Sequence, residues 1–363
     1  MPLSHDDVME ALLTVTEPDL GQDLVSAKLV RDMDISDEAL AVTIALTTPA
    51  TPHKERIRAL VEGALRPLLG RRKLYLTLQA DAPQGRSKLP NVRHVLGVGA
   101  GKGGVGKSTV AVNIALSLAK AGAKVGLLDA DVYGPSVPIM LGLKGHKPVV
   151  NADRKIVAFE AHGIRCISMG FLVGEDTAVA WRGPMVGRAV QQFVEDVDWG
   201  PLDYLIVDLP PGTGDVILSL CQALPLTGAV VVSTPQDVAF ADVLRAVKMF
   251  GMLKVDVIGL VENMSYFRCP DNGKDYNIFG PSHSEDHCKA QELEFLGQLP
   301  IDLALSANAD AGRPIVAAEP DGMLAEKYRQ IAGRVASKLA VLAFAAEKTE
   351  AGGEGFFGAR PSA

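Results

Sequence analysis

Two patterns of hydrophobic spacing follow one another along the chain. Up to about residue 80, helical spacing at the start of the chain and over 54–68 alternates with strand-like runs at 40–46 and 74–78. Turn formers such as Thr47-Thr-Pro-Ala-Thr-Pro52 separate these segments. The pattern predicts a small α+β domain over residues 1–80.

A polar, turn-rich segment over 81–92 predicts a linker, and the pattern changes after it. From His94 onward, short apolar runs alternate with helical periods, which is typical of parallel strands buried on both faces and joined by crossover helices. The predicted strands are Val95–Ala100, Lys124–Asp129, Tyr204–Asp208, Ala229–Ser233, Val257–Val261 and Phe295–Leu299. A helix should run from Met323 to about Glu347.

The expected fold class is therefore α/β, a doubly wound and mostly parallel sheet over 93–347 preceded by the small α+β domain. The Gly-rich segment 348–363 should be a disordered tail. A length of 363 residues with 48% hydrophobic positions agrees with about two domains.

Composition narrows the function classes. A net charge of −7 provides no basic footprint for nucleic acid, and no apolar run approaches the length of a membrane span. Four cysteines are too few for a disulfide-stapled secreted protein of this size. We therefore expect a cytoplasmic protein that binds neither nucleic acid nor membrane.

One motif has a definite chemistry. The segment GKGGVGKS at 101–108 matches G-x-x-x-x-G-K-[ST] and lies between a predicted strand and a predicted helix. In such a loop the backbone N–H groups surround phosphate oxygens, Lys107 reaches the β- and γ-phosphates of ATP, and Ser108 binds Mg²⁺. The residues expected to contact the nucleotide here are Gly101, Gly103, Gly104, Val105, Gly106, Lys107, Ser108 and Thr109.

Acidic residues end two of the predicted strands. Asp208 ends an apolar run in the pattern of a magnesium-binding Walker B strand, and Asp129 should lie near the same ion. Asp131 is the candidate for orienting the water that attacks the γ-phosphate. The following segment, Pro210-Pro-Gly212, could act as a switch that senses this phosphate.

Lys102 adds a second lysine to the loop, and with it the loop resembles the signature-lysine subclass of P-loop ATPases that includes MinD and ParA. In that subclass the matching lysine reaches across a face-to-face homodimer to the partner's nucleotide, and a residue matching Asn263 contacts adenine. The resemblance implies an ATPase that hydrolyses ATP as a dimer, with Lys102, Lys107 and Asp131 as catalytic residues.

Three longer motifs narrow the resemblance. DADVYGPS at 129–136, DLPPGTGD at 208–215 and ENMSYF at 262–267 are similar to segments of the Mrp/ApbC family of iron–sulfur cluster carrier ATPases, over about 93–315. That family implies a homodimer that binds a [4Fe–4S] cluster at the subunit interface, passes it to apo-proteins and hydrolyses ATP slowly.

The start of the chain adds to this resemblance. Glu17-Pro-Asp-Leu-Gly21 and Thr47-Thr-Pro-Ala50 resemble a small iron–sulfur assembly domain that is often fused in front of bacterial members. Thr51 stands where that domain often carries a cysteine, so no reactive thiol is expected there.

The chain departs from the family after ENMSYF, where members usually carry C-x-x-C. Here Cys269 is followed by Asn272 in place of the second cysteine. Cys288 is the candidate replacement, since Cys269 and Cys288 from two subunits would supply four thiolates. Alternatively, Cys288 is an ordinary helix residue, or a zinc site forms from these cysteines with His283 and His287, although that spacing fits no common zinc motif.

Two other functions stay open from the sequence. One is a MinD/ParA-like positioning switch, and the other is a nucleotide-gated adaptor that holds no cluster.

Overall fold

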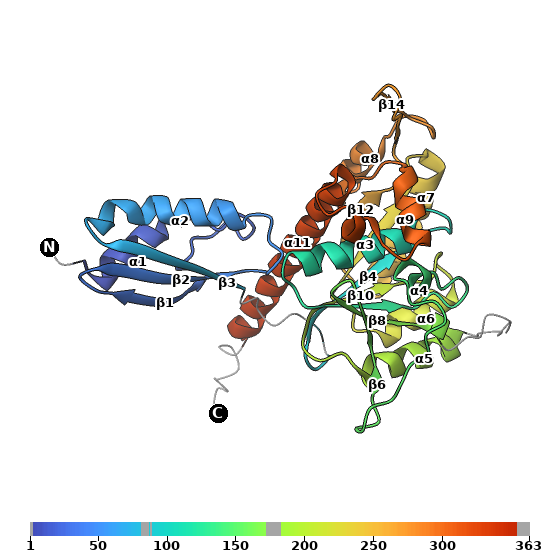
Figure 1. Cartoon of the computed structure of the whole chain (residues 1–363), viewed down its shortest axis with the longest axis horizontal. Coiled ribbons are helices and arrows are strands. Elements are labelled where there is room, and N and C mark those ends of the chain that lie inside the picture. The colour runs from blue at the N-terminus through green and yellow to red at the C-terminus, as the bar shows by residue number, and fades with distance from the viewer. Residues whose placement is uncertain (1–2, 81–86, 88, 172–182, 354–363) are drawn as a thin grey trace, which may run out of the picture. The chain divides into compact units, whose positions relative to one another are not determined.

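The computed structural model describes residues 3–80, 87, 89–171 and 183–353. It divides into two compact units, one formed by Met1–Gly85 with Ala336–Ala363 and the other by Arg86–Val335 (Figure 1). Most of the linker predicted over 81–92 lies outside the described residues, and Val92 is already the first residue of a strand.

The first unit holds a three-stranded sheet in the order β1-β2-β3, with β1 antiparallel and β3 parallel to β2. Its elements are α1 (His5–Leu13), β1 (Val30–Ile35), β2 (Ala39–Leu46), α2 (Lys54–Leu69) and β3 (Lys73–Ala80). The buried faces of α1, α2 and β2 form its core. The sequence pattern did not predict β1, because this edge strand is only partly buried and three charged residues interrupt its apolar positions.

The last helix, α11 (Met323–Gly353), is longer than the sequence predicts. It continues through 348–353, so this part of the predicted disordered tail is helical instead. The physical reason is that no glycine or proline lies between Arg334 and Ala351 to end the helix earlier. The rest of that tail, 354–363, lies outside the described residues.

The second unit contains an eight-stranded sheet in the order β15-β12-β11-β4-β10-β5-β8-β7. Neighbouring strands are parallel except for β7 and β8. All of the strands predicted in this region are present. The sheet strands are β4 (Val92–Gly99), β5 (Val125–Asp129), β7 (Phe159–Ala161), β8 (Ile164–Ser168), β10 (Leu202–Asp208), β11 (Gly228–Ser233), β12 (Val257–Glu262) and β15 (Phe295–Gln298).

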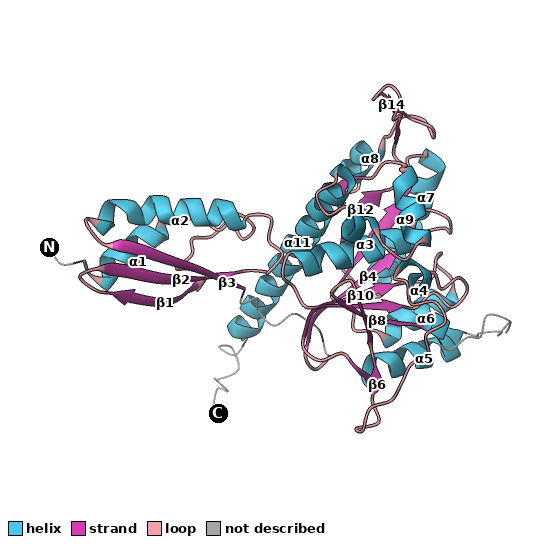
Figure 2. Cartoon of the chain, in the orientation of Figure 1, coloured by secondary structure: helices cyan, strands magenta, loops and turns pink. Residues whose placement is uncertain are grey.

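Helices cover both faces of this sheet (Figure 2). They are α3 (Lys107–Lys120), α4 (Val137–Met140), α5 (Gly183–Asp196), α6 (Asp215–Ala223), α7 (Asp237–Met252), α8 (Ser284–Ala290), α9 (Leu303–Asp310) and α10 (Ile315–Ala318), with the 3₁₀ turn Met169–Phe171. Two-residue strands complete the unit: β6 (Ile156–Val157), β9 (Val197–Asp198), β13 (Phe267–Arg268) and β14 (Asp275–Tyr276).

The central strands are buried on both sides. In β10, Leu205 and Val207 belong to one hydrophobic cluster with residues of α5, α6 and α7. Tyr204 and Ile206, which alternate with them along the strand, are buried as well. Successive side chains of a strand point to opposite faces, so the nearly continuous apolar run of β10 reflects two covered faces.

The order of the strands defines where a ligand can bind. β4 lies between β11 and β10, and the chain leaves it through α3 to reach β5 on the far side of β10. The crevice outside the carboxyl ends of such strands is the usual ligand site of an open α/β sheet. No helix in the described ranges is both long and apolar enough to cross a membrane.

Candidate functional site

The loop between β4 and α3 has the glycines that its path requires. Gly104 and Gly106 both have φ of +81°, and Gly106 caps the N-terminus of α3. A Cβ atom on Gly106 would overlap the amide of Asn263, and one on Gly101 would overlap the backbone of Asp242 in α7. Two other segments therefore pack directly against the loop and hold its shape.

Lys107, the first residue of α3, is at the centre of a buried polar cluster. Its Nζ lies 2.5 Å from Oδ1 of Asp208, 3.7 Å from Oδ2 of Asp131 and 3.2 Å from Oγ of Ser108. The structure thus brings together four of the predicted site residues. The two carboxylates provide negative charge beside the buried Lys107. Thr109, also predicted, lies half-buried in the first turn of the same helix.

Asp129 and Asp208 are register neighbours on β5 and β10, and both are completely buried. Oδ2 of Asp129 accepts hydrogen bonds from Ser168 Oγ at 2.8 Å and from the Val137 backbone N–H at 3.3 Å. Burial and the charge of Asp208 raise the pKa of Asp129, and burial raises that of Asp208 although Lys107 opposes the shift. Ser168 was not predicted, because a serine at the end of a strand has no distinctive sequence signal.

Oδ2 of Asp208 has no hydrogen-bond partner among the described residues although it is buried. A buried carboxylate oxygen without a partner is unfavourable, and a hard cation would satisfy it. The arrangement therefore fits Mg²⁺ near Asp208 and Ser108.

Asp131 is held in a tight turn just beyond β5. Its Oδ1 accepts hydrogen bonds from the backbone N–H groups of Tyr133 and Gly134, at 3.2 and 3.3 Å. Its other oxygen is the one that lies near Lys107. The two oxygens of Asp131 thus have different partners, the turn on one side and Lys107 on the other.

Lys102 is half-exposed and makes no hydrogen bond or ion pair with the described residues. The predicted switch segment lies beside the same loop, because the Gly212 backbone N–H donates to the carbonyl of Ala100 at 2.9 Å. A Cβ on Gly103 would lie 3.9 Å from Pro211. The segment 210–212 is thus adjacent to the start of the loop.

Asn263 follows β12 and contacts the loop rather than projecting into solvent. Its Nδ2 donates to the carbonyl of Val105 at 2.9 Å, and its buried Oδ1 has no partner in the described part of the chain. Met264 next to it has φ of +58°, a strained value for a residue with a side chain. Asn263 therefore links the strand end to the phosphate loop, and its carbonyl oxygen is a buried acceptor without a partner among the described residues.

Cys269 lies in the turn of the β13–β14 hairpin, which projects from the second unit (Figure 1). Its backbone N–H donates to the backbone carbonyl of Lys274 at 2.9 Å, and the cysteine is only partly buried. Asn272 shapes the turn, because its amide donates to the Tyr276 hydroxyl at 3.0 Å and accepts from the Lys274 backbone N–H at 2.9 Å. The residue that replaces the expected cysteine thus has a structural role.

Cys288 has the environment of an ordinary helix residue, which was one of the two alternatives from the sequence. It is completely buried in α8 and belongs to the hydrophobic core, and burial raises the pKa of its thiol to about 12. A ligand shared between two subunits must reach the surface as a thiolate, so the structure does not support Cys288 as a cluster ligand. Cys166 and Cys221 are buried as well, in β8 and α6.

In the first unit, Asp19 of the first motif contacts residues that directly follow the second motif. Its carboxylate accepts from the Thr51 hydroxyl at 3.4 Å and lies 3.3 Å from Nε2 of His53. Glu17 is buried and holds the adjoining turn through backbone N–H groups of Asp19 and Leu20, at 2.7 and 2.6 Å. The segments quoted for the assembly domain therefore form one local structure.

Two family profiles match the chain. One, described as ParA: NUBPL iron-transfer P-loop NTPase, matches residues 91–336, and the other, an iron-sulfur cluster assembly protein domain, matches residues 5–74. An iron-sulfur cluster carrier protein of Deinococcus radiodurans is 48% identical over 338 residues, which are 93% of this chain and 96% of that protein. The iron-sulfur cluster transfer protein NUBPL of Dictyostelium discoideum is 45% identical over 302 residues, which are 82% of this chain and 94% of that protein.

Solved structures agree with the fold. A nucleotide-binding protein of Archaeoglobus fulgidus, solved in complex with ADP and found to contain cobalt, is 38% identical with a TM-score of 0.57, and the match covers 64% of this chain and 90% of that one. The cell division ATPase MinD of Pyrococcus furiosus shares the fold, with a TM-score of 0.51 at 21% identity. The match covers 67% of this chain and 98% of that one. Because the first profile spans most of the chain, this protein belongs to the NUBPL iron-transfer P-loop NTPase family and has an iron-sulfur cluster assembly domain in front.

Proposed function

We propose that this protein is an iron–sulfur cluster carrier that binds and hydrolyses ATP as a homodimer and delivers its cluster to apo-proteins. The observation that carries the proposal is the partly exposed Cys269, in a projecting hairpin of the same unit that holds a complete phosphate loop. The relatives named as cluster carriers and transfer proteins support it.

For nucleotide binding, the loop 101–108 would bind the phosphates, and Asn263, which lies against this loop, would contact the adenine. Ser108 and Asp208 would hold Mg²⁺, with Asp129 behind them. The ion would neutralise charge on the phosphates and so favour phosphoryl transfer. Lys107 would exchange its carboxylate partners for phosphate oxygens, and the anchored Asp131 would orient the attacking water.

Lys102 is the residue that makes the proposed ATPase depend on a dimer. It lies in the phosphate loop without a hydrogen-bond or ion-pair partner among the described residues, so its charge is available to a second subunit. A cation placed on the partner's phosphates stabilises the charge that develops during hydrolysis.

For the cargo, one Cys269 from each subunit would provide two thiolates. A [4Fe–4S] cluster usually takes four cysteine ligands, so this pair would hold it less firmly than a complete set. Weaker retention favours delivery over storage, which suits a carrier.

Anaerobic reconstitution with iron and sulfide tests the proposal. The wild type should develop charge-transfer absorbance and bind about four irons per dimer. Cys269→Ala should lose both, whereas Cys221→Ala, which removes a buried thiol instead, should retain them. Asn272→Cys adds a thiol to the same turn and should increase cluster retention.

A nucleotide-gated adaptor without a cluster is the second candidate, favoured by the structural role that Asn272 has in place of a second thiol. It predicts a folded, ATP-binding sample without iron or charge-transfer absorbance. That result would reject the carrier and leave the nucleotide site intact.

A further inference from the structure

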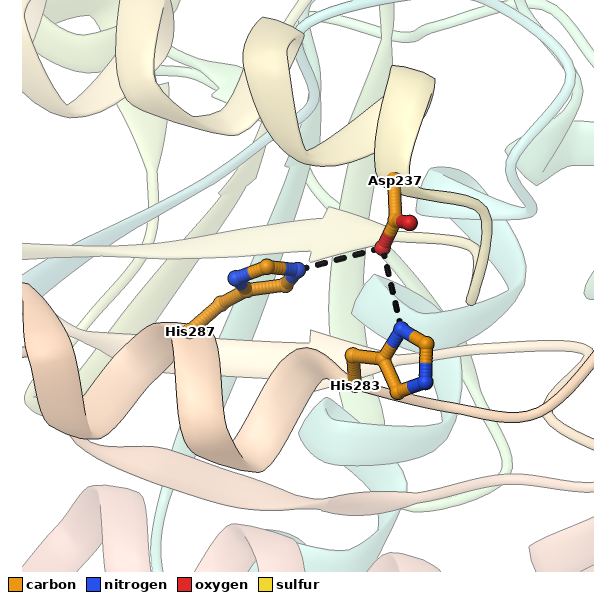
Figure 3. Close-up of side chains that lie close together, drawn as sticks. All are labelled: Asp237, His283 and His287. Carbon is orange, nitrogen blue, oxygen red and sulfur yellow. Dashed lines mark hydrogen bonds and ion pairs between the residues drawn. The ribbon is translucent and has the colours of Figure 1, made fainter.

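Two histidines and an aspartate from separate segments meet on the surface of the second unit. Asp237 is the first residue of α7, His283 caps the N-terminus of α8, and His287 lies one turn into that helix. Figure 3 shows both rings turned toward the same oxygen of Asp237. Nδ1 of His283 is 3.3 Å and Nε2 of His287 is 3.1 Å from Oδ1 of Asp237.

These separations match a metal site. With bonds of about 2.0–2.1 Å, the ligand atoms around a tetrahedral ion lie about 3.4 Å from one another. Two of the three ligand–ligand distances are already close to this value, and all three atoms lie within 4.8 Å of one another. Imidazole nitrogen and carboxylate oxygen are also common donors to Zn²⁺ and Fe²⁺.

The local structure holds the ligands in place. The His287 backbone N–H donates to the carbonyl of His283 at 2.9 Å, and residues four apart share one face of a helix. The His287 ring stacks on Phe240 of α7, with centroids 4.7 Å apart and planes at 24°. Phe240 therefore orients one imidazole toward the aspartate at the start of its own helix.

Charge and access also suit a cation. Both imidazole rings are aimed at a carboxylate oxygen, so the cluster contains two nitrogen donors and one oxygen donor. Glu285 and Asp286 add negative charge in the first turn of α8. The side chains of Asp237, His283 and His287 are 66%, 51% and 40% exposed, which leaves an ion open to solvent on one side.

We propose that Asp237, His283 and His287 bind a divalent first-row transition-metal ion, with water completing its coordination. Each imidazole would use the nitrogen that now contacts Asp237 and carry its proton on the other one. The site does not include Cys269 and does not depend on the proposed carrier function. It also differs from the zinc site considered from the sequence, because Asp237 takes the place of the cysteines.

The ion would connect α7, which contacts the phosphate loop, with a segment that is linked to the same loop through the end of β12. α7 packs against Gly101 through the backbone of Asp242. On the other side, the hydroxyl of Ser282, which precedes His283, donates to the carboxylate of Glu262 at 2.6 Å. The next residue, Asn263, donates a hydrogen bond to the carbonyl of Val105 in the loop. Metal binding would therefore stabilise the edge of the sheet beside this loop.

Titration of untagged, metal-free full-length protein with Zn²⁺ and, anaerobically, with Fe²⁺ tests the site. Calorimetry should show one equivalent of saturable binding at micromolar protein concentration for at least one of these ions. Co²⁺ as a spectroscopic probe should give d–d bands without thiolate charge transfer. Asp237→Asn, His283→Ala and His287→Ala should each weaken binding at least tenfold. Loss of a residue that only hydrogen-bonds to a metal ligand already lowers metal affinity about 10–100-fold.

Two matched variants define the alternatives. His5→Ala removes an exposed histidine from the first unit, and Cys269→Ala removes the exposed thiol; both should bind as the wild type does. The proposal is overturned if neither ion binds saturably, if binding survives in the His283→Ala/His287→Ala double variant, or if Cys269→Ala abolishes it. The ion should also raise the melting temperature of the wild type and leave that of the double variant unchanged.

Discussion

Lys107 and Asp208, from α3 and β10, form a buried ion pair with 2.5 Å between Nζ and Oδ1. Lys107→Ala should lower the free energy of unfolding by about 3 kcal/mol, because it leaves buried carboxylates without a cation. The double variant Lys107→Ala/Asp208→Asn should lose less, since the amide carries no charge. Denaturant unfolding of both variants without nucleotide checks this; equal losses would show that the pair is not coupled.

The two loop lysines should affect ATP differently. Lys107→Ala should abolish nucleotide binding, because no other cation in the described cluster reaches the phosphates. Lys102→Ala should preserve binding but reduce turnover, since its charge would act on the partner's nucleotide. Binding is measured with a fluorescent ATP analogue and turnover by phosphate release. Wild-type turnover in Lys102→Ala would rule out the action of this lysine in trans.

Two glycines of the same loop should differ in their tolerance of a side chain. In Gly101→Ala the added Cβ overlaps the backbone of Asp242, so the variant should lose about 2 kcal/mol of stability. Gly103→Ala should change stability by less than about 0.5 kcal/mol, because its Cβ meets only Pro211 at 3.9 Å. Thermal unfolding of the two variants is the measurement, and a reversed order would contradict the packing of α7 on the loop.

The parts of the site that sequence could predict are those with a local cause. The phosphate loop is contiguous, and its glycines meet conformational needs of their own segment. Asp129 and Asp208 were predictable because each ends a strongly apolar strand. The contact of Asn263 with Val105 could not be predicted, because it joins residues that are 158 positions apart in the sequence.

The cysteine and histidine positions show where the sequence alone could not decide between alternatives. α8 has only seven residues, too few for helical periodicity to reveal that Cys288 faces the core. His283 and His287 were visible as a pair, but their partner Asp237 lies 46 and 50 residues earlier. Only the packing of α7 beside α8 brings the three together.

His94 should make stability depend on pH. Burial, together with the charge of Arg93, lowers the pKa of His94 to about 4, and the ring stacks on Tyr204. The unfolded chain takes up this proton near pH 6.5, whereas the folded chain does so only near pH 4, so stability falls as the pH drops between these values. At pH 5 the loss should be about 2 kcal/mol.

The variant His94→Phe retains an aromatic ring against Tyr204 and removes the titration. The free energy of unfolding of this variant, relative to that of the wild type, should rise by about 2 kcal/mol as the pH falls from 7.5 to 5. Unfolding curves across this range, with His5→Gln as an exposed control, provide the comparison. A constant difference between His94→Phe and wild type would contradict the assigned cause.

The central claim, that the protein delivers a cluster, is tested most directly by transfer. Reconstituted wild type, purified from free iron and sulfide, is mixed anaerobically with an apo-enzyme that needs a [4Fe–4S] cluster for activity. Acceptor activity should appear as the donor loses absorbance, and Cys269→Ala treated identically should restore none. Equal restoration by the two proteins, or none by a cluster-loaded wild type, would contradict it.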